Sequence, residues 1–290
     1  MANNIVLAKN YIDLLDEVYK SASVTADLTS ASTLIRQGAN VNELVYPQIE
    51  TTGLGDYDRK SGYTDGSVNL VWKTAAFNYD RGTRISVDTM DDQETFNLAF
   101  GAAGADLQRT KVAPEADAFT FAALAGAEGI SIGTPATFAD ASAFLAALLE
   151  AKNKMDEDEV PEEGRILYAT PTLLNGIMAL DTTKSREVLN AFSVRKKVPQ
   201  SRFYTAIDLL DGKTAGEELG HYKKAAAGKD INFMIVHKPA VLKWDKHVAG
   251  DIIAPSANPS SDAYILKYRK YGIVDVYKNK AAGIYLSHKE

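Results

Sequence analysis

One serine lies in the local sequence of a hydrolase nucleophile. Residues 129–133 read Gly-Ile-Ser-Ile-Gly and fit the Gly-x-Ser-x-Gly pattern, in which the serine occupies a sharp turn between a buried strand and a helix. A later carboxylate and either His221 or His237 could complete a triad. Residues 121–128, however, are rich in alanine and continue a helix, and a Thr-Pro pair directly after the motif interrupts any second helix. The sequence therefore favours a coincidental match, and a serine hydrolase using Ser131 is the alternative from an enzymatic class.

Metal and cofactor chemistry lack their usual residues. The chain has no cysteine, which removes disulfides, thiolate metal sites and cysteine nucleophiles. Six carboxylates crowd residues 156–163 without the alternating ligands and distal glutamate of an EF-hand, so a solvated charged loop is the better interpretation. No glycine-rich phosphate loop is present. We expect no metal and no cofactor, since the histidines also lack zinc spacing: His221, His237, His247 and His288.

Two basic clusters raise the question of nucleic acid binding. Residues 195–197 read Arg-Lys-Lys, and residues 267–271 read Lys-Tyr-Arg-Lys-Tyr. Aromatic side chains between cations can stack on single-stranded bases. Strand alternation, however, places Tyr268 on one face and Lys267 and Arg269 on the other, which is typical of an ordinary amphipathic strand. We interpret the second cluster as structural.

Composition allows a sizeable core in one large domain or two smaller ones. The chain has 290 residues, 46% of them hydrophobic, and no apolar run that would cross a membrane. The N-terminus does not read as a signal peptide. The net charge of −6 divides into −12 over residues 1–220 and +6 over residues 221–290. Complementary charge could guide subunits into register or face an anionic partner, and simple solvated surfaces are the alternative.

A long polar hairpin is predicted early in the chain. Its first arm covers about residues 45–52, and its second alternates Val68, Leu70, Trp72 and Thr74 as a half-buried strand does. The tip, residues 53–66, has four glycines and five charged side chains. A lone two-stranded ribbon is marginal in water, so we expect the hairpin to lie on a neighbouring subunit.

An unusually long helical stretch comes next. It runs from about Asp91 to Leu124, with an apolar stripe at Phe96, Phe100, Ala103 and Leu107. At 1.5 Å per residue its length would be roughly 50 Å. Proline lacks a backbone donor, so Pro114 predicts a kink or break near residues 109–111, and two ordinary helices are the alternative.

The other predicted elements are shorter. Residues 5–19 predict an amphipathic arm helix, and Thr137 with Asp140 predicts a capping box at the start of the next helix. Strands are predicted at residues 165–169 and 230–237, an extended segment at 203–209, and an exposed insertion at 211–229. A helix begins at Pro171, after Thr170 as its cap. A terminal antiparallel meander contains strands at 264–268, 273–277 and 284–286.

The order of these parts resembles the major capsid protein of tailed bacteriophages, which has the Hong Kong 97-type fold. The most similar stretches are residues 77–87 (Phe-Asn-Tyr-Asp-Arg-Gly-Thr-Arg-Ile-Ser-Val), 233–240 (Phe-Met-Ile-Val-His-Lys-Pro-Ala), 271–277 (Tyr-Gly-Ile-Val-Asp-Val-Tyr) and 282–285 (Ala-Gly-Ile-Tyr). The resemblance covers nearly the full chain. It lies in the order of the parts and in their local residue patterns, because the family has no short diagnostic motif.

The resemblance implies an α+β chain with five parts. These are an N-terminal arm (1–44), an extended hairpin called the E-loop (45–88), a P-domain with a long spine helix (89–134), an α/β A-domain (135–230) and C-terminal P-domain strands (231–290). It also implies a structural role without enzymatic activity. Copies of the chain would form hexamers and pentamers of an icosahedral shell around double-stranded DNA, assembled in a bacterial cytoplasm and found in the virion.

Partners are implied by the same resemblance. The hairpin would contact the neighbouring subunit through its tip charges, Asp56, Asp58, Arg59 and Lys60. A portal and a scaffold, either a separate protein or a segment already cleaved, are also implied, whereas a membrane is not. The same fold builds encapsulin nanocompartments, and an encapsulin-like shell is the nearer alternative function.

Some relatives join a hairpin lysine covalently to a P-domain asparagine with the help of a glutamate. In this sequence Lys60 lies at the tip and Asn258 and Asn279 lie late in the chain, but no glutamate occurs between Glu218 and Glu290. We therefore predict that the crosslink is absent.

Overall fold

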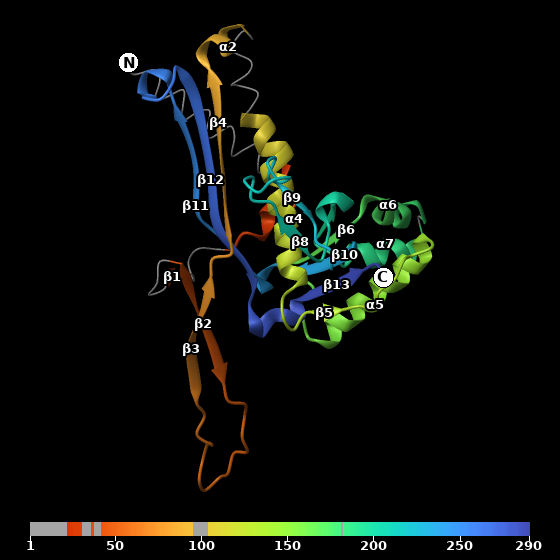
Figure 1. Cartoon of the computed structure of the whole chain (residues 1–290). Coiled ribbons are helices and arrows are strands. Elements are labelled where there is room, and N and C mark those ends of the chain that lie inside the picture. The colour runs from red at the N-terminus through yellow and green to blue at the C-terminus, as the bar shows by residue number, and fades with distance from the viewer. Residues whose placement is uncertain (1–21, 31–35, 38–41, 95–103, 181) are drawn as a thin grey trace. The chain divides into compact units, whose positions relative to one another are not determined.

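The chain forms two units, and each is described by itself. The computed structural model describes residues 22–30, 36–37, 42–94, 104–180 and 182–290 (Figure 1). One unit contains Met1–Ser30 and Tyr79–Glu290, and the other contains Ala31–Asn78. The predicted arm helix at residues 5–19 lies outside the described residues.

The smaller unit is the predicted hairpin. Strands β2 (Glu43–Thr51) and β3 (Val68–Ala76) pair antiparallel in unbroken register from Glu43 opposite Ala76 to Thr51 opposite Val68. A short strand β1 (Arg36–Gln37) pairs with the base of β2. Both predicted arms are confirmed because turn-forming residues bound each of them, at a tip with four glycines.

A three-stranded sheet with long strands belongs to the larger unit. Strand β12 (Ala263–Val276) lies between β11 (Val241–Ile253) and β4 (Tyr79–Asp88) and pairs antiparallel with both. The sequence-based separation of residues 264–268 from 273–277 was wrong. The strand continues through Gly272, and glycine is needed there because a Cβ would stand 2.8 Å from the Trp244 carbonyl oxygen. Residues 79–88, grouped with the hairpin on sequence, pair along β12.

The predicted long helix is traced in part. Helix α2 (Thr89–Glu94) lies at its predicted start, residues 95–103 lie outside the described residues, and residues from 104 to the end of α4 (Ala113–Ala125) have helical backbone. The segment η3 (Leu107–Val112) is a π-helix, with the residues at both of its ends in right-handed helical conformation. This local widening lies where a distortion was predicted. It precedes Pro114, which cannot donate the usual backbone hydrogen bond.

A five-stranded sheet forms the second layer of the larger unit. Its order is β5-β13-β10-β6-β7, with bounds β5 Ser131–Ile132, β6 Arg165–Ala169, β7 Val194–Lys197, β10 Ile231–His237 and β13 Ile284–His288. The predicted terminal meander was wrong, since its first two strands are both parts of β12 and its third belongs to this second sheet. Strand β13 leaves the C-terminal strands and pairs antiparallel with β10, because its apolar side chains complete this second sheet.

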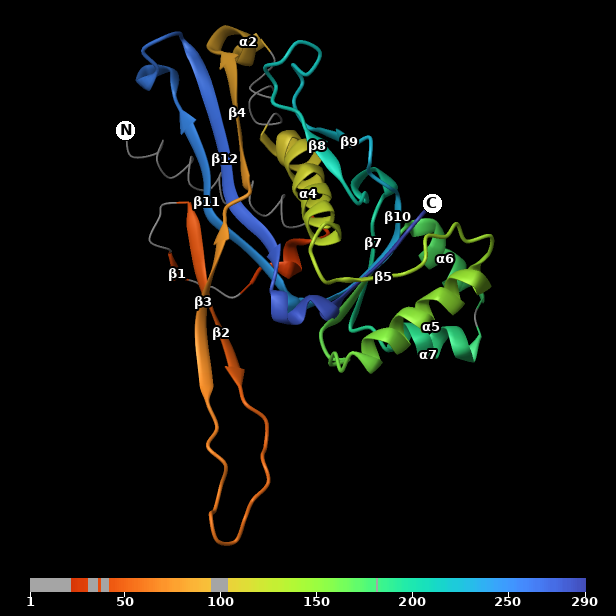
Figure 2. The same cartoon turned by 60° about the horizontal axis from the view of Figure 1, so that its bottom comes forward.

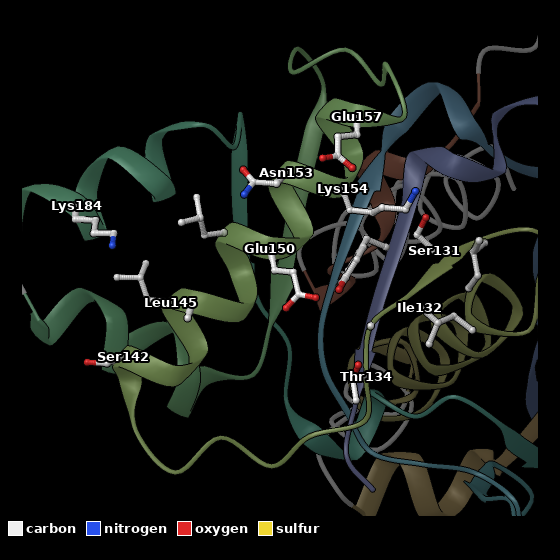
Figure 3. A pocket seen from close by; sticks show the side chains of 15 residues that line it. Ser131, Ile132, Thr134, Ser142, Leu145, Glu150, Asn153, Lys154, Glu157 and Lys184 are labelled. Atoms are coloured by element: carbon white, nitrogen blue, oxygen red, sulfur yellow. The ribbon is translucent and has the colours of Figure 1, made fainter.

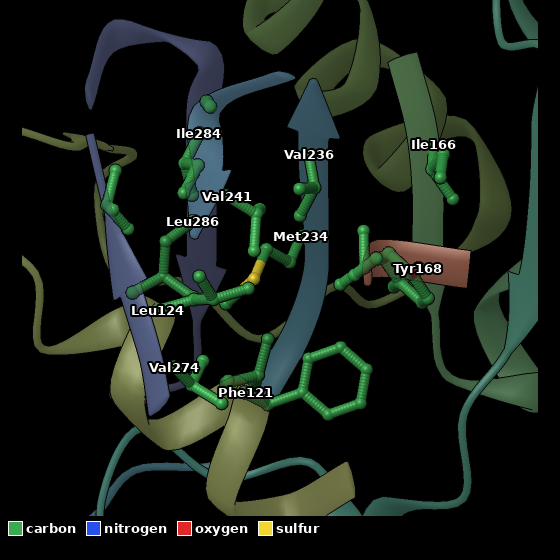
Figure 4. Packing of buried hydrophobic residues seen from close by; sticks show 14 of the residues in the cluster. Phe121, Leu124, Ile166, Tyr168, Met234, Val236, Val241, Val274, Ile284 and Leu286 are labelled. Atoms are coloured by element: carbon green, nitrogen blue, oxygen red, sulfur yellow. The ribbon is translucent and has the colours of Figure 1, made fainter. Parts of the chain in front are cut away.

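Helices cover both faces of the five-stranded sheet (Figure 2). Helices α5 (Ala141–Glu157), α6 (Pro171–Leu180) and α7 (Thr183–Asn190) pack on the face that carries Leu167, Phe233 and Ile235. Helix α4 packs on the other face through Phe121 and Leu124, as Figure 4 shows. Burial on both sides explains why β10 is a continuous apolar run.

The start of α5 differs from the prediction by one turn. Asp140, rather than Thr137, is the N-cap, because its extended backbone lets its carboxylate accept a hydrogen bond from the Ala143 N–H at 2.7 Å. The start of α6 at Pro171 is confirmed. The smaller elements are η1 (Ala26–Leu28), η4 (Gln200–Arg202), β8 (Ile207–Leu209), β9 (Tyr222–Lys224), η5 (Lys238–Ala240), η6 (Pro255–Ala257) and η7 (Lys278–Gly283).

A buried carboxylate on α4 holds residues 22–30. Asp117 has no exposed surface and accepts hydrogen bonds from Ser23 Oγ (2.7 Å), the Val24 and Thr25 backbone N–H groups (both 3.1 Å) and Thr25 Oγ1 (2.7 Å). Arg202 of η4 adds an ion pair at 3.1 Å. One carboxylate therefore joins three segments that are distant in the sequence.

Two lysines secure the same segment. Lys243 of β11 is buried, and its Nζ donates to the Thr25 carbonyl oxygen at 3.0 Å and to Thr25 Oγ1 at 2.8 Å. Burial, and next the charge of Lys270, lower the pKa of Lys243 to about 8. Lys196 of β7 donates to the Val24 carbonyl oxygen at 2.8 Å and pairs with Asp27 at 2.6 Å. The segment is thereby fixed to both sheets.

Replacing Asp117 should destabilise the larger unit strongly. Asp117→Ala leaves buried donors and the Arg202 guanidinium without their acceptor, and we expect a loss of about 3–5 kcal/mol in the free energy of unfolding. Denaturant unfolding followed by circular dichroism measures this loss. The control Asp208→Ala removes an exposed carboxylate on β8 and should change stability by less than about 0.5 kcal/mol. Equal effects of the two variants would contradict the role assigned to Asp117.

Candidate functional site

The hairpin presents an apolar face that it cannot bury itself. Directly opposed residues of an antiparallel pair share a face, and the register places these side chains together: Val45, Pro47 and Ile49 from β2, and Val68, Leu70 and Trp72 from β3. In the outer part of this face the exposed fractions are 62% for Ile49, 72% for Val68 and 51% for Leu70. The other face of the same part is more polar, with Gln48, Glu50 and Asn69. We call the first set the apolar hairpin face; such contiguous exposure marks an interaction surface.

The predicted contact residues lie at the exposed hairpin tip. The Asp58 carboxylate accepts hydrogen bonds from the backbone N–H groups of Lys60 (2.6 Å) and Ser61 (3.0 Å). The hydrogen bonds from Ser61 and then Lys60 lower the pKa of Asp58. The rings of Tyr57 and Tyr63 meet edge to face with centroids 4.9 Å apart. Asp58 therefore shapes the turn.

The remaining tip charges project into solvent. Asp56, Arg59 and Lys60 are exposed and make no ion pair within the described part of the chain. Their assignment to inter-subunit contacts stays a prediction.

A polar cluster joins β4, α4 and the loop before β9. Glu115 of α4 accepts two hydrogen bonds from Arg81 of β4, at 2.6 and 3.2 Å, and one from Tyr79 Oη at 3.2 Å. His221 Nδ1 lies 3.7 Å from the same carboxylate. His221 also has a positive φ of 74°, and its carbonyl oxygen accepts from Arg81 at 3.2 Å and from the Leu210 N–H at 2.9 Å. The residues line a cavity of about 400 Å³.

The charges of this cluster determine how Glu115 titrates. Burial alone raises the pKa of Glu115, but interactions with His221 and Arg81 outweigh it and hold the pKa below its ordinary value. Sequence analysis missed the cluster because Arg81, Glu115 and His221 are far apart in the chain and belong to no motif. Its arrangement suits a structural role, in which the cluster holds β4 against α4.

Ser131 does not occupy a nucleophile elbow. It begins the two-residue strand β5, which pairs in parallel with β13, and α5 begins only at Ala141. Its Oγ lies 3.5 Å from an Asp158 carboxylate oxygen. The groove beside it, shown in Figure 3, is lined by residues among which there is no histidine. The base that a triad requires is therefore missing from this groove.

The acidic segment is partly structural rather than a free loop. Helix α5 extends through Glu157, and three carboxylates form ion pairs: Asp156 with Arg165 (2.7 Å), Asp158 with Lys154 (2.7 Å) and Glu162 with Lys152 (3.0 Å). In the part of the chain that is described, no cluster of three metal-binding side chains occurs. No helix in that part has the length and apolarity to span a membrane.

Asn258, one of the two crosslink candidates, holds a turn. Its side-chain nitrogen donates to Ser261 Oγ at 3.1 Å and to the Ala263 carbonyl oxygen at 3.0 Å, and its Oδ1 accepts from the Ser260 N–H at 3.1 Å. Asn279 is exposed in η7. The predicted absence of a crosslink stays a prediction.

Sequence comparison finds no relative. No protein-family model matches the chain, and no curated protein sequence does.

Solved structures match over almost the whole chain. The capsid structure of the cyanophage P-SCSP1u has a TM-score of 0.58 at 13% identity and covers 93% of this chain and 88% of that chain. A structure from Mycobacterium phage Che8 has a TM-score of 0.58 at 12% identity, over 91% and 90%. A virus-like particle from Pyrococcus furiosus has a TM-score of 0.61 at 8% identity, over 96% and 98%. The predicted α+β fold of the Hong Kong 97 type is confirmed.

The Glu115 cluster predicts a specific dependence of stability on pH. The folded pKa of Glu115 lies below its unfolded value, so its stabilisation is present above the unfolded pKa and is lost as pH falls through the folded pKa. Glu115→Gln should therefore be less stable than the unchanged chain at pH 7, by about 1.5–3 kcal/mol. The difference should shrink towards zero under acid conditions, which urea unfolding between pH 7 and 3 measures.

The control for this comparison is Glu187→Gln, an exposed glutamate on α7. It should match the unchanged chain at every pH. A Glu115→Gln deficit that stays constant with pH would show that the carboxylate charge is not the source of the stabilisation.

Proposed function

We propose that this chain, which has the fold of tailed-phage capsid structures, is the major capsid protein of a tailed phage or prophage. The observation that carries the proposal is the structural match over about nine-tenths of the chain to capsids from different phages. A PhiM1 mature capsid and a Staphylococcus phage Andhra capsid match at TM-scores of 0.51 and 0.56. Most of the fold is therefore shared rather than one small motif.

The apolar hairpin face supports self-assembly independently of the match. A two-stranded ribbon is a single layer and cannot bury either of its own faces. Burying a large apolar side chain against a partner contributes about 1.5–3 kcal/mol. A second copy of the chain is the partner that is always present at the required concentration. We infer that the hairpin is the E-loop and that its apolar face lies on a neighbouring subunit.

The finer features of the role are parts of the same proposal. Hexamers and pentamers of the chain close into an icosahedral shell around double-stranded DNA, which is contacted without sequence preference. Scaffolding and portal proteins are its assembly partners, the host cytoplasm is where it assembles, and the virion is where it resides. The role is structural and requires no catalysis. In keeping with this, Ser131 lies on a short strand rather than at a nucleophile elbow, and no histidine lines the groove beside it.

An encapsulin-like shell is the second candidate, favoured by the likeness to the virus-like particle from Pyrococcus furiosus. Both candidates require the same self-association, and they differ in what the shell encloses. Particles recovered from the native host that contain double-stranded DNA support the capsid. Particles that contain only protein support the compartment.

Self-assembly is the direct test of the proposal. The full chain, purified and concentrated at low and at moderate salt, should form rings, sheets or shells in negative-stain microscopy and fast-sedimenting species in the ultracentrifuge. A chain that remains a monomer under all of these conditions would remove the main support for a shell protein.

Polar substitutions on the apolar hairpin face should block assembly without unfolding the monomer. Leu70→Asp with Trp72→Asp places charge where a neighbour must exclude water, and we expect the assembled fraction to fall by about tenfold or more. Asn69→Asp with Lys73→Asp is the matched control, because these residues share the opposite face of the same strand. Sedimentation measures assembly and circular dichroism measures folding. Similar losses from both variants would mean that strand charge, rather than the apolar face, matters.

The tip charges give a separate prediction. Arg59→Glu with Lys60→Glu should impair assembly and leave the monomer folded, because the inferred contact is electrostatic and both side chains are exposed. The defect should grow as salt is lowered. A double variant that forms normal shells at low salt would show that these cations are not needed.

A further inference from the structure

The five-stranded sheet ends in two open edges. Within the described residues, β5 pairs only with β13 and β7 pairs only with β6. Strands β5 and β13 are parallel, as are β6 and β7, and β10 between them is antiparallel to both β13 and β6. The two edge strands therefore run in the same direction. Open edges are templates for pairing with another chain.

A groove lies along the β5 edge. Residues 130–134 form one wall, and α5 forms the other, with Leu145, which Figure 3 labels, and Leu149 among the lining residues. Its volume is about 1010 Å³. Ile132 is 57% exposed in it although it lies on a strand of the sheet. The groove thus lies beside an open strand edge and contains apolar side chains from both β5 and α5, as the site of an additional strand would.

The β7 edge carries exposed side chains on a fixed backbone. Val194 is 38% exposed, and Arg195 and Lys197 are exposed on the same strand. Lys196, between them, points the other way and is held by Asp27 and the Val24 carbonyl oxygen. Arg195 and Lys197 make no ion pair within the described chain. This edge therefore presents two uncompensated cations on the α5 face of the sheet and one apolar side chain, Val194, on the α4 face.

The charges of the two edges are complementary. Glu150 and Glu157 line the groove, are exposed and have no ion-pair partner among the described residues. Lys154, which lies near them, is already paired with Asp158 at 2.7 Å. Lys184 lies at the end of the groove that is far from β5, as Figure 3 shows. Two free carboxylates on one edge thus match two free cations on the other.

We propose that the β7 edge of one copy docks in the β5–α5 groove of the next copy. Val194 then packs near Ile132 on the α4 face of the joined sheet, while Arg195 and Lys197, on the face that α5 covers, approach Glu150 and Glu157. The contact joins two different surfaces, so it is head to tail. Strands β5 and β7 run in the same direction, and a rotation about an axis along the strands keeps that direction from one copy to the next. A repeated head-to-tail contact builds a ring where its rotation closes, and the proposed contact is of that kind. This inference rests on the proposed function, for which it assigns a contact within one capsomer.

Cysteine crosslinking tests the contact directly, because the chain has no cysteine of its own. Full-length chains with Ile132→Cys and with Val194→Cys are mixed, assembled and oxidised, and a non-reducing gel should show a covalent dimer. The chain with both substitutions should give a ladder of covalent oligomers. Each single variant oxidised alone should stay monomeric on the gel, because a head-to-tail contact does not bring like positions together.

A charge exchange tests the same contact without new bonds. Arg195→Glu with Lys197→Glu should reduce the assembled fraction about tenfold or more, and Glu150→Lys with Glu157→Lys should do the same. All four substitutions in one chain restore complementarity and should recover assembly, which also shows that the folded unit tolerates them. Circular dichroism confirms folding in each case.

The outcomes separate this inference from the proposed function. If the unchanged chain stays monomeric, the shell function fails and the contact fails with it. If the chain assembles but the mixed cysteine variants do not crosslink, or the fourfold exchange assembles no better than either pair, only the proposed contact is overturned. Crosslinking of a single variant with itself, as strong as in the mixture, would exclude the head-to-tail arrangement.

Discussion

The carboxylate of Asp117 is the interaction on which the larger unit depends. A buried charge is tolerated only with a full set of donors, and these come from residues 23–25 and from Arg202. Asp117 lies on α4, which packs between the base of the three-stranded sheet and one face of the five-stranded sheet. Satisfying one carboxylate therefore fixes the helix, and the helix fixes both sheets. Lys243 and Lys196 extend the same constraint from each sheet to the backbone of residues 24 and 25.

Local patterns predicted the elements that depend on local physics. The hairpin arms, strands β6 and β10 and the start of α6 are all explained by alternation, apolar runs or capping residues. Strand β11 was missed because its pattern is irregular: Lys243 is buried, and a bulge lies between Asp245 and His247. The place of β13 was wrong because strand pairing is decided by which sheet needs another apolar layer, and single-strand periodicity does not contain that information.

The candidate sites also divide into those that the sequence could reveal and those that depend on tertiary packing. The tip charges were visible in the sequence, but the apolar hairpin face becomes apparent only when the register aligns Ile49 with Leu70 and Pro47 with Trp72. Aligning the two arms about the glycine-rich tip could have revealed it. The Glu115 cluster gave no such signal, because its members meet only through the packing of β4, α4 and the loop at His221. Likewise, a Gly-x-Ser-x-Gly match gave no nucleophile, since the motif has meaning only between a strand and a helix.

Two features depart from the usual distribution of polar and apolar groups in a self-sufficient monomer. Charges are buried and fully paired at Asp117 and Glu115, while apolar side chains are exposed on the hairpin and along the β5 edge. Copies that each carry a net charge of −6 repel one another at long range, so apolar contact alone would not select one orientation. Arg195 and Lys197 are uncompensated cations within the acidic part of the chain, and they lie on the sheet edge opposite to Glu150 and Glu157. These opposite charges attract two copies in one relative orientation, while the net charges repel the copies in general. The resulting contacts are individually modest and can be corrected during assembly. The closure of a regular shell requires such contacts.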